Sequence, residues 1–386
     1  MSELDVIIYG ATGYTGGLVA EYMNQTYPNR SWGIAGRNKA KLEHVKSDLD
    51  LPDHVVLIEA DASDPASLNA MVQRARVIIT TVGPYQHYGE PLVAACARYG
   101  TDYVDLCGEP PFMWSSIETY DEMAKASGAR IVHSCGFDSV PSDLGVLFLQ
   151  TEAKTRFGAP LKDVRCRVRS MVGKFSGGTA ASGRATEEAA KADPAIMARL
   201  ISPFALTPGF EGARQPTGHK PYEDEKLGAW VTPFFMAPVN TKNVHRSNAL
   251  MNHLYGTDFT YEEMILTGSG DAGKAMATHI ATSDPLAGQG YLNPGEGPTR
   301  EERESGSYDF MIYGDSEGGE RLVVGVTGDR DPGYGSTCKM LTECAICLLD
   351  DVADAPGGVL TPAPIFGPAL IGRLEANAGL TFKVED

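Results

Sequence analysis

The sequence lacks an excess of positive charge, although it is long enough to carry one. Lysine and arginine number 33 against 50 aspartates and glutamates, which gives a formal net charge of −17 over 386 residues. A surface with this balance repels the phosphate backbone of nucleic acids unless basic residues gather on one face, and the sequence has no basic tail. We therefore expect no nucleic acid partner and no electrostatic attachment to a membrane.

Long apolar runs are also lacking. No stretch approaches the ~18 apolar residues that a membrane-spanning helix needs. Residues Met1 to Asp5 have neither the basic region nor the apolar stretch of a secretory leader. The sequence thus predicts a chain without a transmembrane segment, which we expect in the cytoplasm.

Metal-binding spacings are absent from the sequence as well. The eight histidines form no HExxH pattern and do not pair with cysteine at zinc spacing, so we expect no metal. The seven cysteines are scattered and odd in number, which favours reduced thiols over a disulfide framework. Cys344 and Cys347 form a CxxC, but their run has helical apolar spacing. We interpret them as small residues of a helix face, with a redox or metal role as the less favoured alternative.

The length predicts two domains or more, at ~150 residues each. The first third alternates short β-branched runs with amphipathic stretches, which is typical of a parallel sheet covered by helices. Asn38, and Asp64 before Pro65, are predicted to start helices, and Gly100 to end one. We expect an α/β fold with a Rossmann-type doubly wound parallel sheet in residues 1–140, its strands lying at 6–9, 32–35, 55–58, 77–82, 103–106 and 130–134.

After about residue 140 the pattern changes to a period of two. Apolar and small residues alternate with arginines from Val164 to Ser170, as in a strand of an antiparallel sheet with one face in water. Segments 308–313 and 321–326 are predicted to form a hairpin. We therefore expect a second, mixed α/β domain at 141–330 that contains an antiparallel sheet and serves substrate binding or dimerisation. Residues 331–386 are predicted to be a mainly helical segment.

The strongest functional signal is the motif GATGYTG, which follows the first predicted strand and precedes a helical stretch. Its first glycine permits a sharp turn, its second lets the backbone approach a pyrophosphate, and its third lets helix pack on strand. The helix then offers free N–H groups to phosphate. The alternative is a glycine-rich turn without a ligand. We assign to dinucleotide binding the residues Gly10, Thr12, Gly13, Tyr14, Thr15 and Gly16.

Arg37 lies 21 residues beyond Gly16, after the second predicted strand. NAD-selective folds usually place an acid near this position, whereas an arginine accommodates the 2′-phosphate of NADP. The guanidinium fork suits a phosphate group. We therefore expect NADP(H) rather than NAD(H), with Arg37 and Asn38 in the site. The alternative is an exposed arginine in a loop.

The ends of the third and fourth predicted strands extend this site. Asp61, followed by Ala62, is placed to accept a hydrogen bond from the adenine amino group, with a turn or capping role as an equal alternative. The next loop lies at the carboxyl edge, where ligands of open α/β sheets bind. From this loop we assign to the cofactor the residues Val82, Gly83 and Pro84.

Tyr85 is the predicted catalytic proton donor. A phenol is neutral at pH 7 and can give a proton or a hydrogen bond to an enolate or amide oxygen as hydride arrives. His87 and Tyr88 are rival candidates, and packing of the Tyr85 ring beneath the cofactor is an alternative of equal weight. The Tyr-x-x-x-Lys pattern of short-chain dehydrogenases occurs only at Tyr222 to Lys226, in a loop-rich region, so we give it no catalytic role.

These motifs together resemble the saccharopine dehydrogenase-like superfamily. The resemblance is carried by GATGYTG at 10–16, AGRN at 35–38, VGPY at 82–85, YVDLCGE at 103–109 and GFDSVPSD at 136–143. Further segments resemble its trans-acting enoyl reductase branch, namely SGGT at 176–179, RSNAL at 246–250, GD at 328–329 with GYG at 333–335, and GVLTP at 358–362.

The resemblance implies NADP(H)-dependent hydride transfer and a group of residues at the nicotinamide end. It also implies that the C-terminal helical segment at 331–386 packs back on the Rossmann domain. Capping or solvated roles remain open for the acids among them. The turn at 176–179 precedes a helical stretch, so it suits a carboxylate or thioester oxygen, or serves only as an N-cap. The expected substrate-binding residues are Asp105, Glu109, Asp138, Ser139, Ser176, Gly177, Gly178, Thr179 and Arg246.

The favoured function is hydride transfer from NADPH to the activated C=C bond of a small or carrier-linked acyl (enoyl) substrate. The apolar run at 230–236 suits an acyl chain, or else a core or dimer contact. The arginines at 165–169 face water beside acids, or bind a phosphate-bearing carrier.

A saccharopine-type imine reductase is the alternative function, with Arg246 holding a substrate carboxylate. A non-catalytic NADP(H)-binding partner protein is the third hypothesis. The long middle connections suggest a homodimer.

Overall fold

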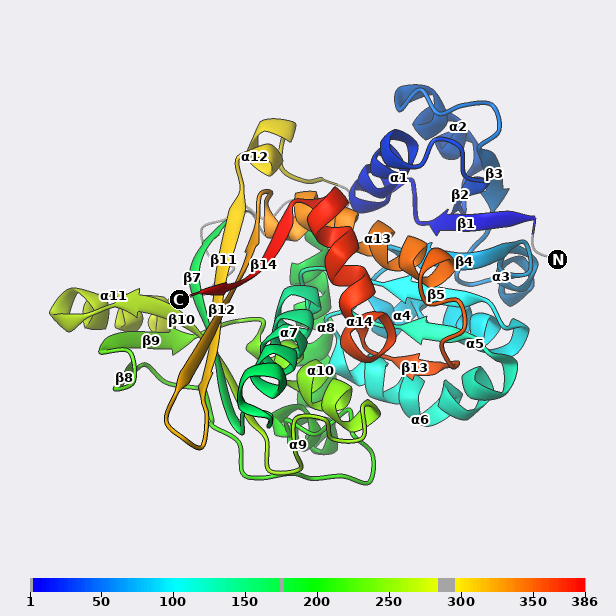
Figure 1. Cartoon of the computed structure of the whole chain (residues 1–386). Coiled ribbons are helices and arrows are strands. Elements are labelled where there is room, and N and C mark those ends of the chain that lie inside the picture. The colour runs from blue at the N-terminus through cyan, green and yellow to red at the C-terminus, as the bar shows by residue number, and fades with distance from the viewer. Residues whose placement is uncertain (1–2, 174–176, 284–295, 386) are drawn as a thin grey trace.

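A computed structural model describes residues 3–173, 177–283 and 296–385, and it contains two seven-stranded sheets (Figure 1). Sheet A has the order β13-β6-β5-β4-β1-β2-β3, with every pairing parallel. This confirms the predicted Rossmann-type sheet. Its strands are β1 (Leu4–Tyr9), β2 (Trp32–Gly36), β3 (Val56–Glu59), β4 (Ala75–Thr80), β5 (Asp102–Asp105), β6 (Arg130–Val132) and β13 (Gly358–Leu360).

Sheet A is buried on both faces, which explains the continuous apolar runs of its strands. In β1, Val6 and Ile8 belong to one hydrophobic cluster, whereas Ile7 and Tyr9 belong to another. The connections after β1 to β5 contain the helices α1 (Tyr14–Thr26), α2 (Lys39–Asp48), α3 (Pro65–Val72), α4 (Tyr85–Tyr88), α5 (Glu90–Tyr99) and α6 (Pro110–Ser127).

Sheet B has the order β14-β12-β11-β7-β10-β9-β8. The predicted hairpin is confirmed, because β11 and β12 pair antiparallel. The sheet is nevertheless mixed, since β7 and β10 run parallel. Its strands are β7 (Asp163–Val172), β8 (Tyr222–Asp224), β9 (Ala229–Pro233), β10 (Thr260–Gly268), β11 (Ser307–Asp315), β12 (Arg321–Gly328) and β14 (Leu380–Glu385).

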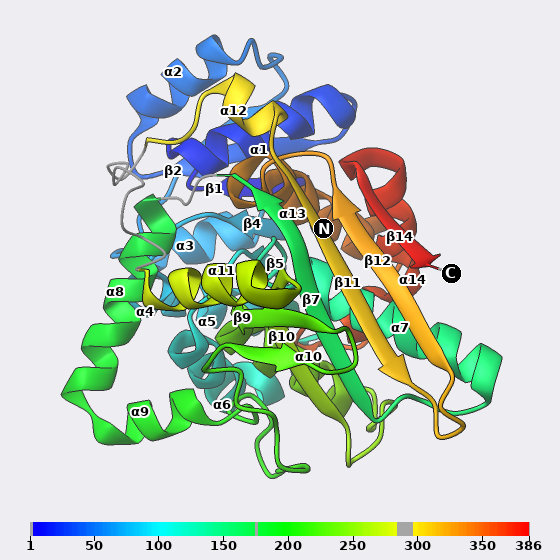
Figure 2. The same cartoon turned by 90° about the vertical axis from the view of Figure 1, so that its left-hand side faces the viewer.

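The remaining helices lie after β6 in the chain, and some of them cover sheet B (Figure 2). α7 packs on β12 and β11, and α11 packs on β9 and β10. The bounds are α7 (Val140–Phe157), α8 (Gly177–Ala192), α9 (Pro194–Ile201), α10 (Ala237–Leu250), α11 (Gly270–Thr282), α12 (Arg300–Glu304), α13 (Thr337–Asp350) and α14 (Pro362–Arg373), with π-helical turns η1 (Pro332–Ser336) and η2 (Leu374–Ala378).

The C-terminal segment does more than the predicted helical packing. Its helix α13 is almost entirely buried and contacts α1, β4 and β5. In addition, β13 joins sheet A beside β6, and β14 joins sheet B beside β12. β13 has three residues, Gly358–Leu360, which are too few to show a periodicity, so no sequence pattern indicated this strand. The predicted domain limits near residues 140 and 330 remain predictions.

The arginines of β7 pair with acids, as predicted. The predicted exposure of these side chains to water is wrong for Arg167. Arg167 is fully buried, and its guanidinium donates to Asp224, Glu262 and Tyr222. Arg169 pairs with two further acids of the same sheet. These side chains are therefore engaged by sheet B itself, which weighs against a phosphate-bearing carrier at this face.

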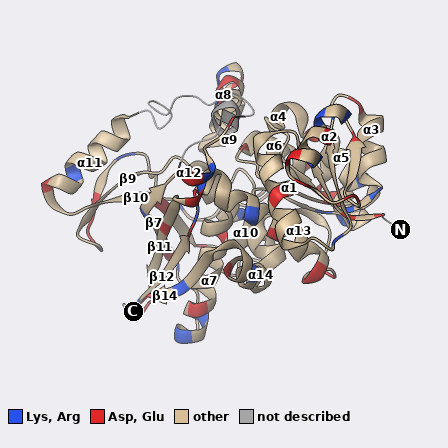
Figure 3. Ribbon diagram, turned by 90° about the horizontal axis from the view of Figure 1, so that it is seen from above, with Lys and Arg blue, Asp and Glu red and all other residues tan. Residues whose placement is uncertain are grey.

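Figure 3 shows basic and acidic positions intermixed over both halves of the molecule. Among the helices within the described residues, none has the length and apolar character needed to cross a bilayer.

Candidate functional site

The glycine-rich turn is built for close approach of backbone to a ligand. Gly10 has a φ of +93°, and a Cβ there would lie 2.7 Å from the Thr81 Oγ1 atom. A Cβ on Gly16 would lie 2.3 Å from the Gly10 carbonyl oxygen, so only glycine lets α1 pack on this turn. Gly13 is the N-cap of α1, and as a glycine it has no side chain to accept a hydrogen bond from the first helical N–H groups. The N–H groups at the start of α1 fit a diphosphate.

The ends of β2 and β3 place one cation and one anion beside this turn. Arg37 is exposed, and it acts electrostatically on both Tyr9 and Asp61. Asp61 accepts hydrogen bonds from the Ser63 amide at 2.9 Å and hydroxyl at 2.8 Å, which lower the pKa of its carboxyl. Asn38 caps α2 as predicted, accepting from the Lys41 amide at 3.0 Å. The exposed guanidinium fits a ribose phosphate.

The loop after β4 brings Tyr85 inward rather than toward the sheet edge. Its side chain is 4% exposed and stacks on Phe112, with ring centroids 5.7 Å apart. The phenol donates to the Thr80 carbonyl oxygen at 3.2 Å and accepts from the Leu106 amide at 3.4 Å. Burial raises the pKa of this phenol well above its usual value. This geometry weighs against proton donation by Tyr85 and favours the packing alternative.

Asp105 ties the loop after β5 to the loop after β6. The carboxylate is fully buried and accepts hydrogen bonds from the Tyr103 hydroxyl, the Cys107 amide and the Ser134 amide at 2.8 to 3.0 Å. The Nδ1 atom of His133 lies 2.7 Å from the same carboxylate. With four polar partners from the two loops, this carboxylate holds the loops together.

Glu109 is the second saturated acid of the site. Its carboxylate accepts from the backbone amides of Tyr85 and Gln86, both at 2.9 Å, and so caps the start of α4. It also accepts from the Gln86 side chain and from the Ser182 hydroxyl of α8 at 2.6 Å. Gln86 in turn donates to Thr186 of α8 at 2.9 Å. Glu109 therefore anchors a helix of the second domain on the predicted nicotinamide end.

Asp138, the third acid, has no such partners. Within the described part of the chain, the only hydrogen bond to its carboxylate comes from its own backbone amide. It lies between two glycines, because a Cβ on Gly108 or Gly136 would come within 3.0 or 3.4 Å of its carboxylate oxygens. Burial, followed by the charges of Asp105 and Glu109, raises the pKa of Asp138 to about 7. This carboxyl group can therefore carry a proton at neutral pH.

Ser139 belongs to a buried polar network between the domains. Its hydroxyl accepts from the Asn243 side chain of α10 at 2.6 Å, and the same amide reaches the Ser134 hydroxyl at 3.1 Å. Ser139 is fully buried, so its observed contacts position α7 and α10. Of the predicted turn at 176–179, Ser176 lies outside the described residues, and Gly177, Gly178 and Thr179 open α8.

Arg246 does not meet a carboxylate among the described residues. Its guanidinium donates to the backbone carbonyls of Leu206 at 2.8 Å and Val359 at 2.6 Å. Burial lowers the pKa of this side chain to about 10. The arginine thus connects α10 with β13 and with the loop that contains Leu206. These contacts weigh against its predicted role in binding a substrate carboxylate.

The C-terminal segment supplies contacts that the residue-by-residue reasoning missed. Thr337 accepts a hydrogen bond from the Phe137 amide at 3.0 Å, next to Asp138. The ring of Tyr334 packs edge-on against Tyr14 of the glycine turn, with centroids 4.8 Å apart. The GYG segment at 333–335 was the available signal, but nothing local to it shows that it reaches the first turn.

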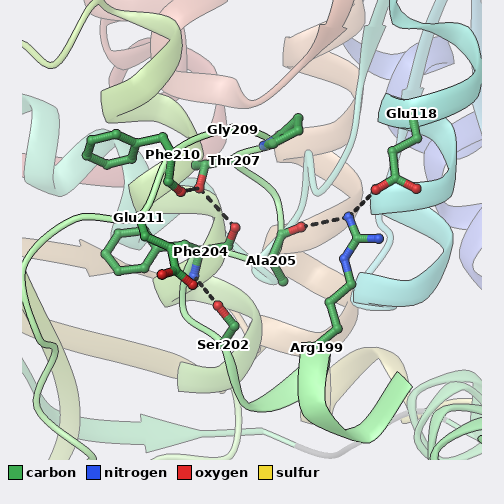
Figure 4. Close-up of a pocket in the computed structure, with 10 residues that line it drawn as sticks. Glu118, Arg199, Ser202, Phe204, Ala205, Thr207, Gly209, Phe210 and Glu211 are labelled. Atoms are coloured by element: carbon green, nitrogen blue, oxygen red, sulfur yellow. Dashed lines mark hydrogen bonds and ion pairs between the residues drawn. The ribbon is translucent and has the colours of Figure 1, made fainter. Parts of the chain in front are cut away.

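A surface hollow of about 540 Å³ lies between α6, α9 and the loop at 202–211 (Figure 4). Its cation, Arg199, is already engaged by Glu118 and by the Ala205 carbonyl oxygen, and it lies over the Trp114 ring at 4.5 Å. We assign no ligand to it. Within the part of the chain that the structure describes, no cluster of three His, Cys, Asp or Glu side chains is arranged for a metal ion.

Comparison with known proteins agrees with this geometry. Residues 6–132 match the family described as saccharopine dehydrogenase NADP binding domain. A putative trans-acting enoyl reductase of Mycobacterium tuberculosis is 41% identical, covering 99% of this chain and 97% of that protein. A trans-acting enoyl reductase of Mycobacterium bovis is 38% identical, covering 96% of each.

Solved structures show the same fold at low sequence identity. Saccharopine dehydrogenase (L-Glu forming) from Saccharomyces cerevisiae matches with a TM-score of 0.57 and 11% identity, covering 99% of both chains. Homospermidine synthase from Legionella pneumophila, solved in complex with NAD, has a TM-score of 0.54 and 11% identity, covering 100% of this chain and 92% of that one.

Proposed function

Because the chain belongs to the saccharopine dehydrogenase-like superfamily, in its trans-acting enoyl reductase branch, we propose that this NADP(H)-dependent oxidoreductase reduces the activated C=C bond of an acyl substrate. The observation that carries the proposal is the near full-length similarity to relatives named enoyl reductases. The geometry supports it, because the predicted nicotinamide end holds a carboxyl group that is free to give a proton.

In the proposed reaction the chain binds the cofactor, holds the substrate and supplies a proton. NADPH, when bound, supplies a hydride to the β-carbon of the double bond. The turn at 10–16 binds the diphosphate and Arg37 binds the 2′-phosphate, assisted by the loop at 82–84. The electron pair of the C=C bond moves to the α-carbon and its carbonyl oxygen. The Asp138 carboxyl gives its proton to the α-carbon and regains one from water.

The neighbouring acids keep Asp138 ready for this role. Asp105 and Glu109 each accept several hydrogen bonds, and their negative charges oppose ionisation of Asp138. Of these three carboxyl groups, Asp138 has its pKa raised and is the one that we propose to hold a proton. Glu109 also fixes α8, which we propose as the wall of the substrate pocket.

A substrate panel tests the proposed function. We expect the purified protein to oxidise NADPH with enoyl thioesters and not with amine and oxo-acid pairs. Oxidation with only the amine pairs would establish the imine reductase instead. Tight NADPH binding without turnover of either set would favour the non-catalytic binding protein. We also propose a cytoplasmic homodimer, which light scattering of the purified chain tests for its oligomeric state.

Replacing Arg37 with alanine should weaken binding of NADPH and leave binding of NADH unchanged. Loss of a charge-assisted hydrogen bond to phosphate predicts a Kd for NADPH roughly 10- to 100-fold higher. Titration calorimetry with both nucleotides measures this selectivity. Arg76→Ala removes an exposed arginine at the opposite, amino end of β4 and is the matched control. Equal losses of affinity for NADPH and NADH would contradict the assignment of Arg37 to the 2′-phosphate.

Replacing Tyr85 with phenylalanine separates packing from proton donation. Because both hydrogen bonds of the phenol go to backbone groups, we expect a loss of stability of about 1 kcal/mol and turnover within ~3-fold of the parent. Urea denaturation and steady-state NADPH oxidation measure the two effects. A turnover loss beyond ~10-fold in a fully folded variant would restore Tyr85 as the proton donor.

A further inference from the structure

A segment far along the chain lies directly over the tyrosine of the glycine turn. The Tyr14 hydroxyl donates to the Pro298 carbonyl oxygen and accepts from Nη1 of Arg303, 289 residues away in the sequence. Nη1 of Arg303 also donates to the Pro298 carbonyl oxygen at 2.9 Å, and the guanidinium carbon lies 5.6 Å from the Tyr14 ring centroid. A Cβ on Gly297 would lie 2.1 Å from the same ring. The chain therefore crosses Tyr14 in close contact.

Backbone hydrogen bonds also fix the position of Arg303. Its carbonyl oxygen accepts from the Asp331 amide at 3.0 Å, and its amide donates to the Thr299 carbonyl at 3.1 Å. Asp331 in turn caps η1 by accepting from the Tyr334 and Gly335 amides. Figure 2 shows α12 next to α1. The cation is thus held over the first turn of α1 by two segments from outside sheet A.

The charge pattern around α1 leaves this cation available for an anion. The first turn of α1 contains no acidic residue, and its N-cap offers no side-chain acceptor. Among the described residues Arg303 forms no ion pair, and Nη1 is the only nitrogen of its side chain that donates a hydrogen bond. Nε and Nη2 remain for a ligand, and a guanidinium fork matches a phosphate group. Asp331 acts on Arg303 electrostatically, but its oxygens are engaged by the amides of η1.

We propose that Arg303 is a cofactor-binding residue that the second domain contributes, and that its guanidinium binds the diphosphate of the dinucleotide at the start of α1. The bound diphosphate then connects the glycine turn with the 298–303 segment, which β11 follows in the chain. This inference concerns nucleotide binding and does not depend on which substrate is reduced.

The test compares Arg303→Gln with Arg300→Gln, using NADPH and NADH as the two probes. Arg300 lies on the same short helix, is exposed and pairs with Glu304, so its replacement removes the same charge without touching Tyr14. We expect Arg303→Gln to raise the Kd for both nucleotides by ~10-fold or more, because both carry the diphosphate. Arg300→Gln should leave both values near those of the parent.

Arg37→Ala serves as the reference variant, because that change should raise the Kd for NADPH and leave the Kd for NADH unchanged. A loss confined to NADPH in Arg303→Gln would place the guanidinium at the 2′-phosphate and overturn the proposal. Unchanged Kd values with a lower melting temperature would also overturn it, leaving Arg303 as a structural contact only. Should Arg303→Gln fail to fold, Arg303→Lys keeps the charge without the fork. A higher Kd for both nucleotides, with the salt dependence of binding retained, would support the proposal, and unchanged Kd values for both would refute it.

Discussion

Asp138→Asn should lower turnover by ~100-fold or more while NADPH affinity stays close to that of the parent. General acid catalysis contributes roughly 10²- to 10⁴-fold, and an amide at this position cannot give up a proton. Asparagine keeps the size of the side chain and its place between the two glycines. Steady-state NADPH oxidation with an enoyl thioester and nucleotide titration measure the two quantities separately.

The pH profile gives a second, independent readout for Asp138. The protonated carboxyl is the active form and its pKa is about 7, so turnover of the parent should fall as pH rises above that value. The fall in turnover above pH 7 should be absent in Asp138→Asn. The groups that face Asp138 and shape the profile are the charged Asp105 and Glu109 and the Cys107 thiol, whose pKa is raised by burial.

Asp143→Asn is the matched control for this experiment. Asp143 is another buried acid whose pKa burial raises to about 7, but it accepts hydrogen bonds from the Ser247 hydroxyl and the Ala363 amide within α7, α10 and α14. We expect little change in turnover, since asparagine retains an acceptor there. Full activity and an unaltered pH limb in Asp138→Asn would remove Asp138 from the mechanism.

Lys242→Met should raise stability at pH 7 by about 3 kcal/mol, the equivalent of the pKa shift of this ammonium. Lys242 is 3% exposed, and its Nζ donates to the Pro238 carbonyl oxygen at 2.8 Å. Burial lowers its pKa from 10.5 to about 8. Within the described residues no carboxylate pairs with it, so the folded chain bears an uncompensated charge.

The sign of the pH dependence follows from that shift. The unfolded chain binds the Lys242 proton up to about pH 10.5, whereas the folded chain releases it near pH 8. The cost to stability is therefore complete below about pH 8 and disappears as pH rises toward 10.5. Urea denaturation at pH 7 and pH 9.5 should show this gain in the parent and not in Lys242→Met.

Lys154→Met is the control, because Lys154 lies exposed on α7 and the chemical change is identical. We expect its unfolding midpoint to follow that of the parent at both pH values. A loss of stability in Lys242→Met at pH 7 would mean that the ammonium is compensated in solution by a ligand or a partner.

Local sequence was sufficient wherever the determining contacts are local. The glycine turn, the strands of sheet A that precede residue 140 and the Asn38 cap depend on residues within a few positions of one another, so their patterns predicted them. Arg37 was placed at the end of β2 for the same reason, because strand and helix periodicity fixes where the loop lies. The family resemblance rests on these same short segments.

The states of the acids could not be read in this way. Asp105, Glu109 and Asp138 look alike in sequence, yet the first two are saturated by donors and the third is left with its own amide. The donors come from residues up to 73 positions away, such as Ser182 on α8. Tyr85 points inward for a similar reason, since its partners are backbone groups of β4 and of the loop after β5.

The sequence by itself determined the Rossmann-type sheet, the dinucleotide turn and the preference for NADP(H), because each depends on backbone geometry encoded within about one turn or one strand. Only the tertiary structure decided which carboxyl keeps its proton, where the C-terminal strands pair, and that Arg303 meets Tyr14. Those outcomes depend on burial and on hydrogen bonds between distant segments, and such free energies exist only after the chain has folded.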